Sequence, residues 1–341
     1  MDGLAPGITV DTDLIAHQLL LRRPAGKTGT ARREEDPFRI VSGMVNGKTT
    51  GTPLCLLIPN SNQRSGDYAA LSGLARPGHA DYTAQCKYHG FQDARGGGHF
   101  SGRITAALVA SCAILAGALK QKGILIGTHV QECGGVRDRA FEDLNEDITR
   151  LNGQVFAVLD DAAGENMRAV IEAAGSEGDS VGGILETAVT GLPAGLGEPW
   201  FDTVESLLAH AMLSIPGIKG IDFGIGFDGV RLRGSEYNDA FRMENGTVIT
   251  ETNRNGGING GITNGMPVCF RLAVKPTPSI YKEQKTVDFL TGENKPIAIA
   301  GRHDPAILHR ARVVADSMTA LVIADLLAGR YGTDYLADER K

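Results

Sequence analysis

The sequence predicts an α+β fold, in which helices and antiparallel strands follow one another without a regular strand–helix–strand order. Spacings typical of strands and of helices are mixed along the whole 341-residue chain. A hydrophobic content of 42% is sufficient for a buried core, and no linker or strong internal repeat divides the chain. We therefore expect a single domain over residues 1–341.

Helices are predicted where apolar residues recur every three to four positions beside a capping residue. An extended segment at 3–10 precedes the first helix, which opens at Asp11 or Thr12. The uncharged stretch 104–119 is shorter than the ~20 residues that a membrane span needs, so a helix over 104–121 is predicted to lie in the core. The remaining predicted helices are 161–175, 203–214 and 305–330.

Apolar runs and period-two alternation predict the strands. In chain order they are 38–45, 53–59, 124–130, 181–192, 218–227, 246–251 and 266–274. A Gly/Thr turn at 47–52 joins the first two. Residues 22–36 and 60–103 are predicted loops, and 140–160 is an acidic segment of mixed character.

The charge of the chain is uneven. Its net charge is −6, yet residues 22–103 hold twelve Lys/Arg against six Asp/Glu, a local balance of +6. A basic segment in an acidic protein predicts a local anion site and argues against a general nucleic-acid-binding surface. The five cysteines form no CxxC pair and are interpreted as reduced thiols, and the eight histidines lack a metal-ligand spacing, so no metal site is predicted.

Two glycine-rich motifs have competing interpretations. Residues 43–49 imitate a phosphate-binding P-loop, but three residues separate Gly43 from Gly47 where the motif needs four, which favours a plain turn. Residues 95–103 include an RGG sequence, which occurs once and leads into an apolar helix, unlike RNA-binding repeats. They form either an anion-binding nest, with Ser101 as the cap and Arg103 as the charge, or a tight turn.

Two further segments combine cations with titratable groups. His79 lies in the turn 76–81 behind Arg76, where it could exchange protons near neutral pH or make an ordinary polar contact. Asp304, in residues 301–305, precedes the last helix together with an arginine and a histidine. Helix capping by Asp304 explains that pattern as well as acid–base chemistry does.

Six segments of the chain form a specific series: ARPGHADYTAQCKYHGFQDARGGGHFSGR, EGDSVGGILETAVTGLPAGLGEP, SIPGIKGIDFGIGF, NGGINGGITNG, KPTPSI and GRHDPAILHRA. In sequence and in order, these segments resemble those of chorismate synthases. The resemblance implies a lyase that converts 5-enolpyruvylshikimate 3-phosphate to chorismate by 1,4-anti elimination of phosphate, the last common step of the shikimate pathway. It also implies a requirement for reduced FMN, with NADPH or a separate flavin reductase as the source of electrons. Helices between antiparallel sheets, a cytoplasmic homotetramer, and no nucleic-acid or membrane partner are expected on the same ground.

The resemblance also assigns residues. His79 matches the family histidine that protonates the flavin, and Asp304 matches the carboxylate near flavin N5 that takes part in removing the substrate proton. The implied substrate-binding cations are Arg22, Arg23, Arg76, Arg103 and Arg302. The implied FMN-binding residues are His99, Phe100, Ser101, Pro216, Gly217, Gly260, Lys275, Pro276, Thr277, Pro278, Ser279 and Arg302. Glycine makes up 45 residues of the chain, and its clusters at 96–98, 195–197, 256–257 and 260–261 are expected to press main chain against these ligands.

The chain departs from the family pattern at two places. The usual GGGRSSARE reads GGGHFSGRI, so that His99, Phe100 and Ile104 replace an arginine, a serine and a glutamate. Residues 1–7 match a point inside the family pattern. In the family, an F-G-E-S-H-G motif precedes this point, and its histidine protonates the departing phosphate. We therefore expect an N-terminally truncated chain. The alternative function is a protein of the same fold that binds FMN and substrate without turnover.

Overall fold

The computed structural model describes residues 1–24, 35–60, 73–93, 100–299, 301 and 303–337. Its helices are α1 Thr12–Arg22, α3 Asp81–Tyr88, α4 Thr105–Gln121, α5 Leu144–Leu151, α6 Asp161–Ser176, α7 Val204–Leu213, α8 Gly234–Tyr237 and α9 Leu308–Tyr331, with 3-10 turns η3 Gly102–Ile104, η4 Trp200–Asp202, η5 Gly226–Arg231 and η6 Thr333–Leu336. Its strands are β1 Arg39–Ser42, β2 Met44–Val45, β3 Lys48–Thr49, β4 Cys55–Leu57, β5 Leu125–Cys133, β6 Val136–Arg137, β7 Gly183–Thr190, β8 Ile218–Phe223, β9 Phe241–Glu244, β10 Thr247–Thr250, β11 Ile258–Asn259, β12 Ile262–Thr263, β13 Val268–Val274, β14 Gln284–Asp288 and β15 Glu293–Ile297.

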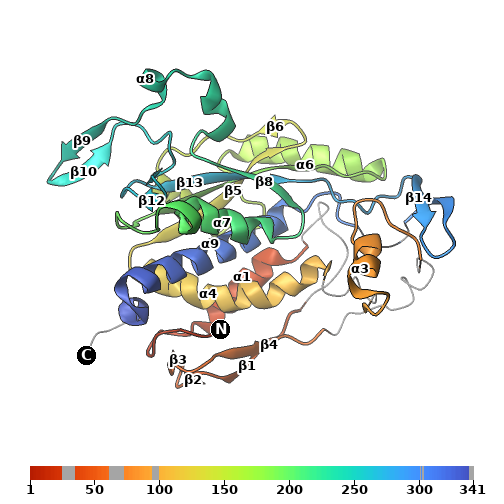
Figure 1. The fold of residues 1–341 in the computed structure, drawn as a ribbon, viewed down its shortest axis with the longest axis horizontal. Helices are drawn as coiled ribbons and strands as arrows, with labels where there is room; N and C mark the ends of the chain where they lie inside the picture. Colours follow the sequence, from red (N-terminus) through yellow and green to blue (C-terminus); the bar gives the residue numbers. More distant parts are fainter. Residues whose placement is uncertain (25–34, 61–72, 94–99, 300, 302, 338–341) are drawn as a thin grey trace.

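The main sheet has five antiparallel strands in the order β6-β5-β7-β13-β8. Helices α1, α4 and α9 lie on one side of it, and the short pairs β1–β4 and β2–β3 lie beyond them (Figure 1). This arrangement confirms the predicted α+β class, with helices between antiparallel sheets.

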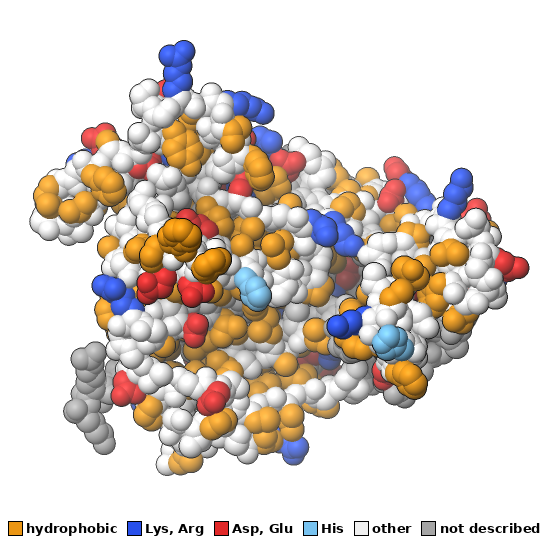
Figure 2. Space-filling model, viewed as in Figure 1, with side chains coloured by type: hydrophobic (Ala, Val, Ile, Leu, Met, Phe, Trp, Pro, Cys, Tyr) orange, Lys and Arg blue, Asp and Glu red, His pale blue; other side chains and the backbone are white. Residues whose placement is uncertain are grey.

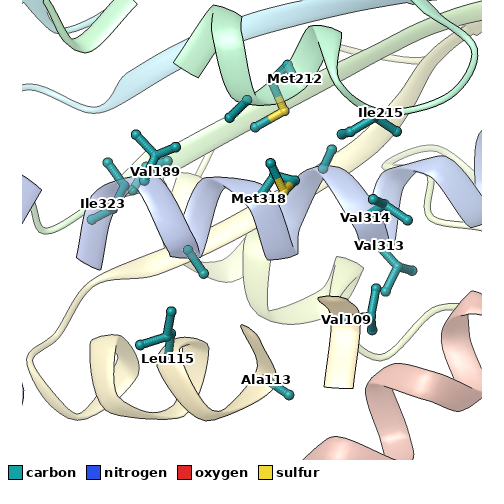
Figure 3. Packing of buried hydrophobic residues seen from close by; sticks show 14 of the residues in the cluster. Val109, Ala113, Leu115, Val189, Met212, Ile215, Val313, Val314, Met318 and Ile323 are labelled. Atoms are coloured by element: carbon teal, nitrogen blue, oxygen red, sulfur yellow. The ribbon is translucent and has the colours of Figure 1, made fainter. Parts of the chain in front are cut away.

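The core is built around α9 and α4. Figure 3 shows Met318 and Val314 of α9 between α4 and the helix α7 that carries Met212. Residues 102–121 are long and apolar enough to match a membrane span by length and composition, with a mean hydropathy of 1.7. Nevertheless α4 packs against both α1 and α9 and contributes Val109 and Ala110 to the core, which confirms the predicted core helix.

Several elements differ from the predictions. Helix α3 lies within the predicted loop 60–103. It was not predicted, because Ala84 is its one buried residue and no apolar stripe marks the helix. Helix α5 lies within the mixed segment 140–160, and the hairpin β14–β15 was not predicted. Strand β8 ends before 227, because Gly224 and Gly226 have positive φ angles and a 3-10 turn follows. The last helix begins three residues after Pro305, with Ile307 at its N-cap.

An arm formed by η5, α8, β9 and β10 projects from the body (Figure 1). Figure 2 shows hydrophobic side chains gathered on it, and Phe227 and Met243 are 77% and 67% exposed. Its base is fixed by Asp239, whose carboxylate accepts hydrogen bonds from the amides of Arg254 (2.8 Å) and Asn255 (2.9 Å). The arm is therefore a firmly attached apolar projection.

Candidate active site

The turn that carries His79 is held against a segment almost two hundred residues later in the chain. The Lys275 ammonium donates a hydrogen bond of 2.8 Å to the Gly78 carbonyl. Gly78 has a φ of 74°, and a Cβ at this position would lie 2.7 Å from Pro278 Cβ. Glycine is needed both for the left-handed backbone and for the close contact. The segments 76–81 and 275–279, both assigned to the site from the sequence, are thus brought together.

His79 is the titratable group of this turn. Its Nε2 lies 2.7 Å from Ser279 Oγ. Burial lowers the pKa of His79 to about 4, and the positive charge of Arg76 adds to the shift. Arg76 itself forms a bidentate pair with Asp81, at 2.9 Å from Nε and 2.8 Å from Nη2. The imidazole is therefore neutral at pH 7 in the chain without ligands. We call Arg76, His79, Lys275 and Ser279 the histidine end.

Residues 275–279 are anchored on both sides. The Lys275 amide donates to the Gly217 carbonyl at 2.9 Å, so the predicted segments 216–217 and 275–279 lie side by side. Ser180 Oγ donates to the Thr277 carbonyl at 2.7 Å. Thr277 Oγ1 is buried and has no hydrogen-bond partner among the described residues, which leaves a hydroxyl for a ligand.

Asp304 lies just before α9, but it does not cap that helix. Its carboxylate accepts a 2.8 Å hydrogen bond from Arg310 Nη1 on the first turns of α9. The same guanidinium donates from Nε to the Arg22 carbonyl at 3.0 Å. Arg310, which sequence reasoning missed, therefore connects the predicted catalytic carboxylate to the end of α1.

Arg22 and Arg103 converge on one carboxylate. Arg22 is 2% exposed, and its guanidinium donates to Thr105 Oγ1 (3.0 Å) and to the Gly102 carbonyl (2.9 Å). Arg103 Nη1 lies 2.6 Å from Asp36 Oδ1, and Arg22 Nη1 lies 3.9 Å from Asp36 Oδ2. We call Arg22, Asp36, Arg103 and Arg310 the arginine end.

A cavity of about 300 Å³ lies between the C-terminal end of α6, residues 279–281 and residues 303–305. Ser279 of the histidine end borders it, as does Asp304, which Arg310 holds. Its lining residues are Glu172, Gly175, Ser176, Asp179, Ser279, Ile280, Tyr281, His303, Asp304 and Pro305. Ser279, which is hydrogen-bonded to His79, and the Asp304 carboxylate therefore line the same cavity.

Some predicted residues are placed elsewhere. Gly260 lies on the β11–β12 turn, far from α3 (Figure 1), and its neighbour Gly261 packs on Thr203. Arg23 donates through Nη2 to the Glu35 carbonyl. Phe100 contacts the ring of Tyr88, with centroids 6.2 Å apart. His99 and Arg302 lie outside the described residues.

The glycine cluster 96–98 lies outside the described residues, and the clusters 195–197 and 256–257 press on other parts of the protein. A Cβ on Gly256 would lie 2.5 Å from the Gly224 amide nitrogen, and one on Gly197 would lie 2.5 Å from the Gly261 carbonyl oxygen. Close backbone approach was expected there, but the neighbour at these positions is another stretch of main chain. Ser101 caps η3 by accepting a hydrogen bond of 3.2 Å from the Arg103 amide.

Comparisons with known proteins agree with the resemblance. A family profile described as chorismate synthase matches residues 1–328. The chorismate synthase of Methanosarcina mazei is 46% identical over 328 residues, which are 95% of this chain and 89% of that relative. The chorismate synthase of Aeropyrum pernix is 44% identical over 326 residues, 95% of this chain and 86% of the relative. A crystal structure of a chorismate synthase matches with a TM-score of 0.75 at 26% identity, covering 99% of this chain and 89% of that one.

Proposed function

The chain belongs to the chorismate synthase family of lyases in aromatic amino-acid biosynthesis, and we propose that it forms chorismate at the site between the histidine and arginine ends. The substrate is 5-enolpyruvylshikimate 3-phosphate. The C3–O bond breaks and its electron pair leaves with phosphate, a proton leaves C6, and the ring gains a second double bond. The observation that carries the proposal is the cavity shared by Ser279, which holds His79, and Asp304.

Substrate binding is assigned to the cations of the histidine and arginine ends. The substrate carries two carboxylates and a phosphate, and guanidinium groups bind such anions through paired hydrogen bonds. Arg22 and Arg103 share one carboxylate, so the arginine end keeps an excess of positive charge. Arg76 contributes a third guanidinium from the histidine end.

The family uses reduced flavin, and the residues present fit FMN on one structural observation. Thr277 Oγ1 is a buried hydroxyl without a partner among the described residues, on the segment 275–279 assigned to FMN. Lys275 adds a cation to the same segment. When bound, reduced FMN supplies an electron-rich ring beside the substrate. Residues 275–279 would hold it against the 216–217 loop.

Proton transfer is assigned to His79 and Asp304. Ser279 holds Nε2 of His79, so we assign proton exchange with ligands to Nδ1. Anionic ligands would raise the pKa of His79 from about 4, because a nearby negative charge favours the imidazolium. The Asp304 carboxylate, fixed by Arg310 at 2.8 Å, receives the proton that leaves the substrate.

The test is an anaerobic assay of the purified chain with chemically reduced FMN and substrate, with chorismate measured by its absorbance. Chorismate formation that is lost without reduced FMN supports the proposal. Calorimetry on the same sample separates the alternative, in which substrate and FMN bind without turnover. A second sample with an added F-G-E-S-H-G segment shows whether that histidine is required. Binding without turnover in both samples would contradict the proposed activity.

Assembly and electron supply complete the proposal. The apolar arm supports a homotetramer, because exposed Phe227 and Met243 would be buried between subunits. Sedimentation analysis checks the mass. A cytoplasmic, single-domain enzyme is proposed, with electrons from NADPH or from a separate reductase. Oxidised FMN plus NADPH, assayed without a reductase, distinguishes those two sources.

A further inference from the structure

Asp36 is a fully buried carboxylate between two arginines. Its side chain is 0% exposed, and Arg103 Nη1 and Arg22 Nη1 lie 2.6 and 3.9 Å from its two oxygens. Among the described residues no neutral donor reaches either oxygen. A buried carboxylate is costly unless cations offset its charge, so Asp36 depends on both guanidinium groups.

The backbone at Asp36 supports the same interpretation. Its φ is 44°, in the left-handed region that non-glycine residues adopt only at a cost, although Asp and Asn tolerate it best. This conformation places the carboxylate against two elements that meet only in the folded chain, the end of α1 at Arg22 and η3 at Arg103. The strain is retained where surrounding contacts fix the residue.

We infer that Asp36 is a positioning residue that aligns Arg22 and Arg103 for the anionic groups of the substrate. The inference rests on the proposed function, which assigns both arginines to substrate binding. Thr105 Oγ1 and the Gly102 carbonyl already fix Arg22. Asp36 lies between the two guanidinium groups, so it holds Arg103 at a fixed place relative to Arg22. Arg103 remains 19% exposed, which leaves it accessible to a ligand.

Two possible roles of Asp36 predict opposite changes in the affinity for the anionic substrate when its charge is removed. If Asp36 only occupied the place of a ligand anion, its removal would tighten anion binding, because one negative charge next to the site would be lost. If Asp36 aligns the arginines, its removal weakens binding despite the extra net positive charge. A displacement of about 1 Å is sufficient to cost about 10²-fold in rate.

The experiment compares Asp36→Asn with Asp147→Asn in the full chain. Asn tolerates the left-handed backbone, so the first variant changes mainly the charge. Asp147 is the matched control, because it is also a buried carboxylate held by an arginine, Arg139, at 2.5 and 3.0 Å, but on α5 outside the site. Calorimetric titration with 5-enolpyruvylshikimate 3-phosphate, kcat and KM, and thermal unfolding are measured for both.

We expect Asp36→Asn to weaken substrate binding at least about tenfold and to lower kcat, whereas Asp147→Asn lowers stability alone. Unchanged or tighter binding by Asp36→Asn would overturn the inference. If that variant does not fold, Asp36→Glu takes its place. It keeps the charge but moves the carboxylate by one methylene, and wild-type Kd and KM would then overturn the inference. An Arg103→Gln variant with wild-type binding would instead contradict the proposed function.

Discussion

Both ends of the site fix cations by ion pairs or backbone carbonyls, but the histidine end also contains a group that can change its charge. At the histidine end, His79 is neutral at pH 7 and is held by one hydrogen bond to Ser279. At the arginine end, permanent charges are fixed by ion pairs and backbone carbonyls, as for Arg22 and Arg310. The first arrangement suits a group that changes protonation when a ligand arrives, and the second suits groups that must keep charge and place.

The largest expected effect is that of Asp304→Asn. Arg310 of the arginine end holds Asp304, so this variant tests whether a group held by fixed charges takes part in proton transfer. We expect kcat to fall about 10³-fold, since an amide cannot accept the substrate proton. Steady-state assays with reduced FMN measure the loss. Asp222→Asn is the control, because it removes another arginine-paired carboxylate, 2.6 Å from Arg271 on β13. A loss in the control as large as that in Asp304→Asn would assign the effect to folding.

His79→Gln tests the histidine end. Glutamine can still hydrogen-bond to Ser279 but does not exchange a proton near neutral pH, so kcat should fall about 10²-fold with little change in thermal stability. The pH dependence of kcat/KM should lose the ionisation of the free enzyme that belongs to His79. A wild-type rate and pH profile would remove His79 from the mechanism.

Arg76→Ala should act on binding more than on turnover. Loss of a guanidinium beside His79 is expected to raise KM for substrate about tenfold and to change kcat less. Arg76→Lys keeps the charge but not the bidentate pair with Asp81, so its KM should lie between those of the wild type and Arg76→Ala. An unaltered KM in Arg76→Ala would show that this arginine stabilises the turn 76–81 and does not bind the substrate.

The smallest expected effect is on stability in acid. The pKa of His79 falls from 6.5 to about 4 on folding, so the unfolded chain binds the proton more readily. The stability that neutral His79 contributes is therefore complete above pH 6.5 and is lost as the pH falls toward 4. Urea unfolding at pH 7 and 4.5 should show His79→Gln losing roughly 1–2 kcal/mol less than the wild type. Equal losses would contradict the low pKa.

Strong periodicity explains which parts of the fold were predictable. Helices α4 and α9 and strand β13 carry many buried apolar positions, and all three were predicted near their observed ranges. Helix α3 and hairpin β14–β15 were missed because their side chains are mostly polar and few of them are fully buried, so that no buried stripe marks them.

The site was predictable only in part. Motif resemblance named His79, Asp304 and most of the cations, and of these Asp304 lines the cavity together with Ser279, the hydrogen-bond partner of His79. Arg310 and Asp36 were missed, because their importance comes from pairings with Asp304, Arg22 and Arg103 across the fold. Local sequence gives no sign of such pairings, since they exist only after distant segments have packed together.

The distance along the chain between paired residues also has a consequence during synthesis. His79 meets Ser279 two hundred residues later, and the Arg22 carbonyl meets Arg310 after 288 residues. At about 5–20 residues per second, a ribosome needs roughly 10–60 s to supply the second member of these pairs. A nascent chain that has reached α7 already carries His79 and the arginines of α1 and η3, but it cannot yet hold a flavin or an anionic substrate as proposed for the finished chain.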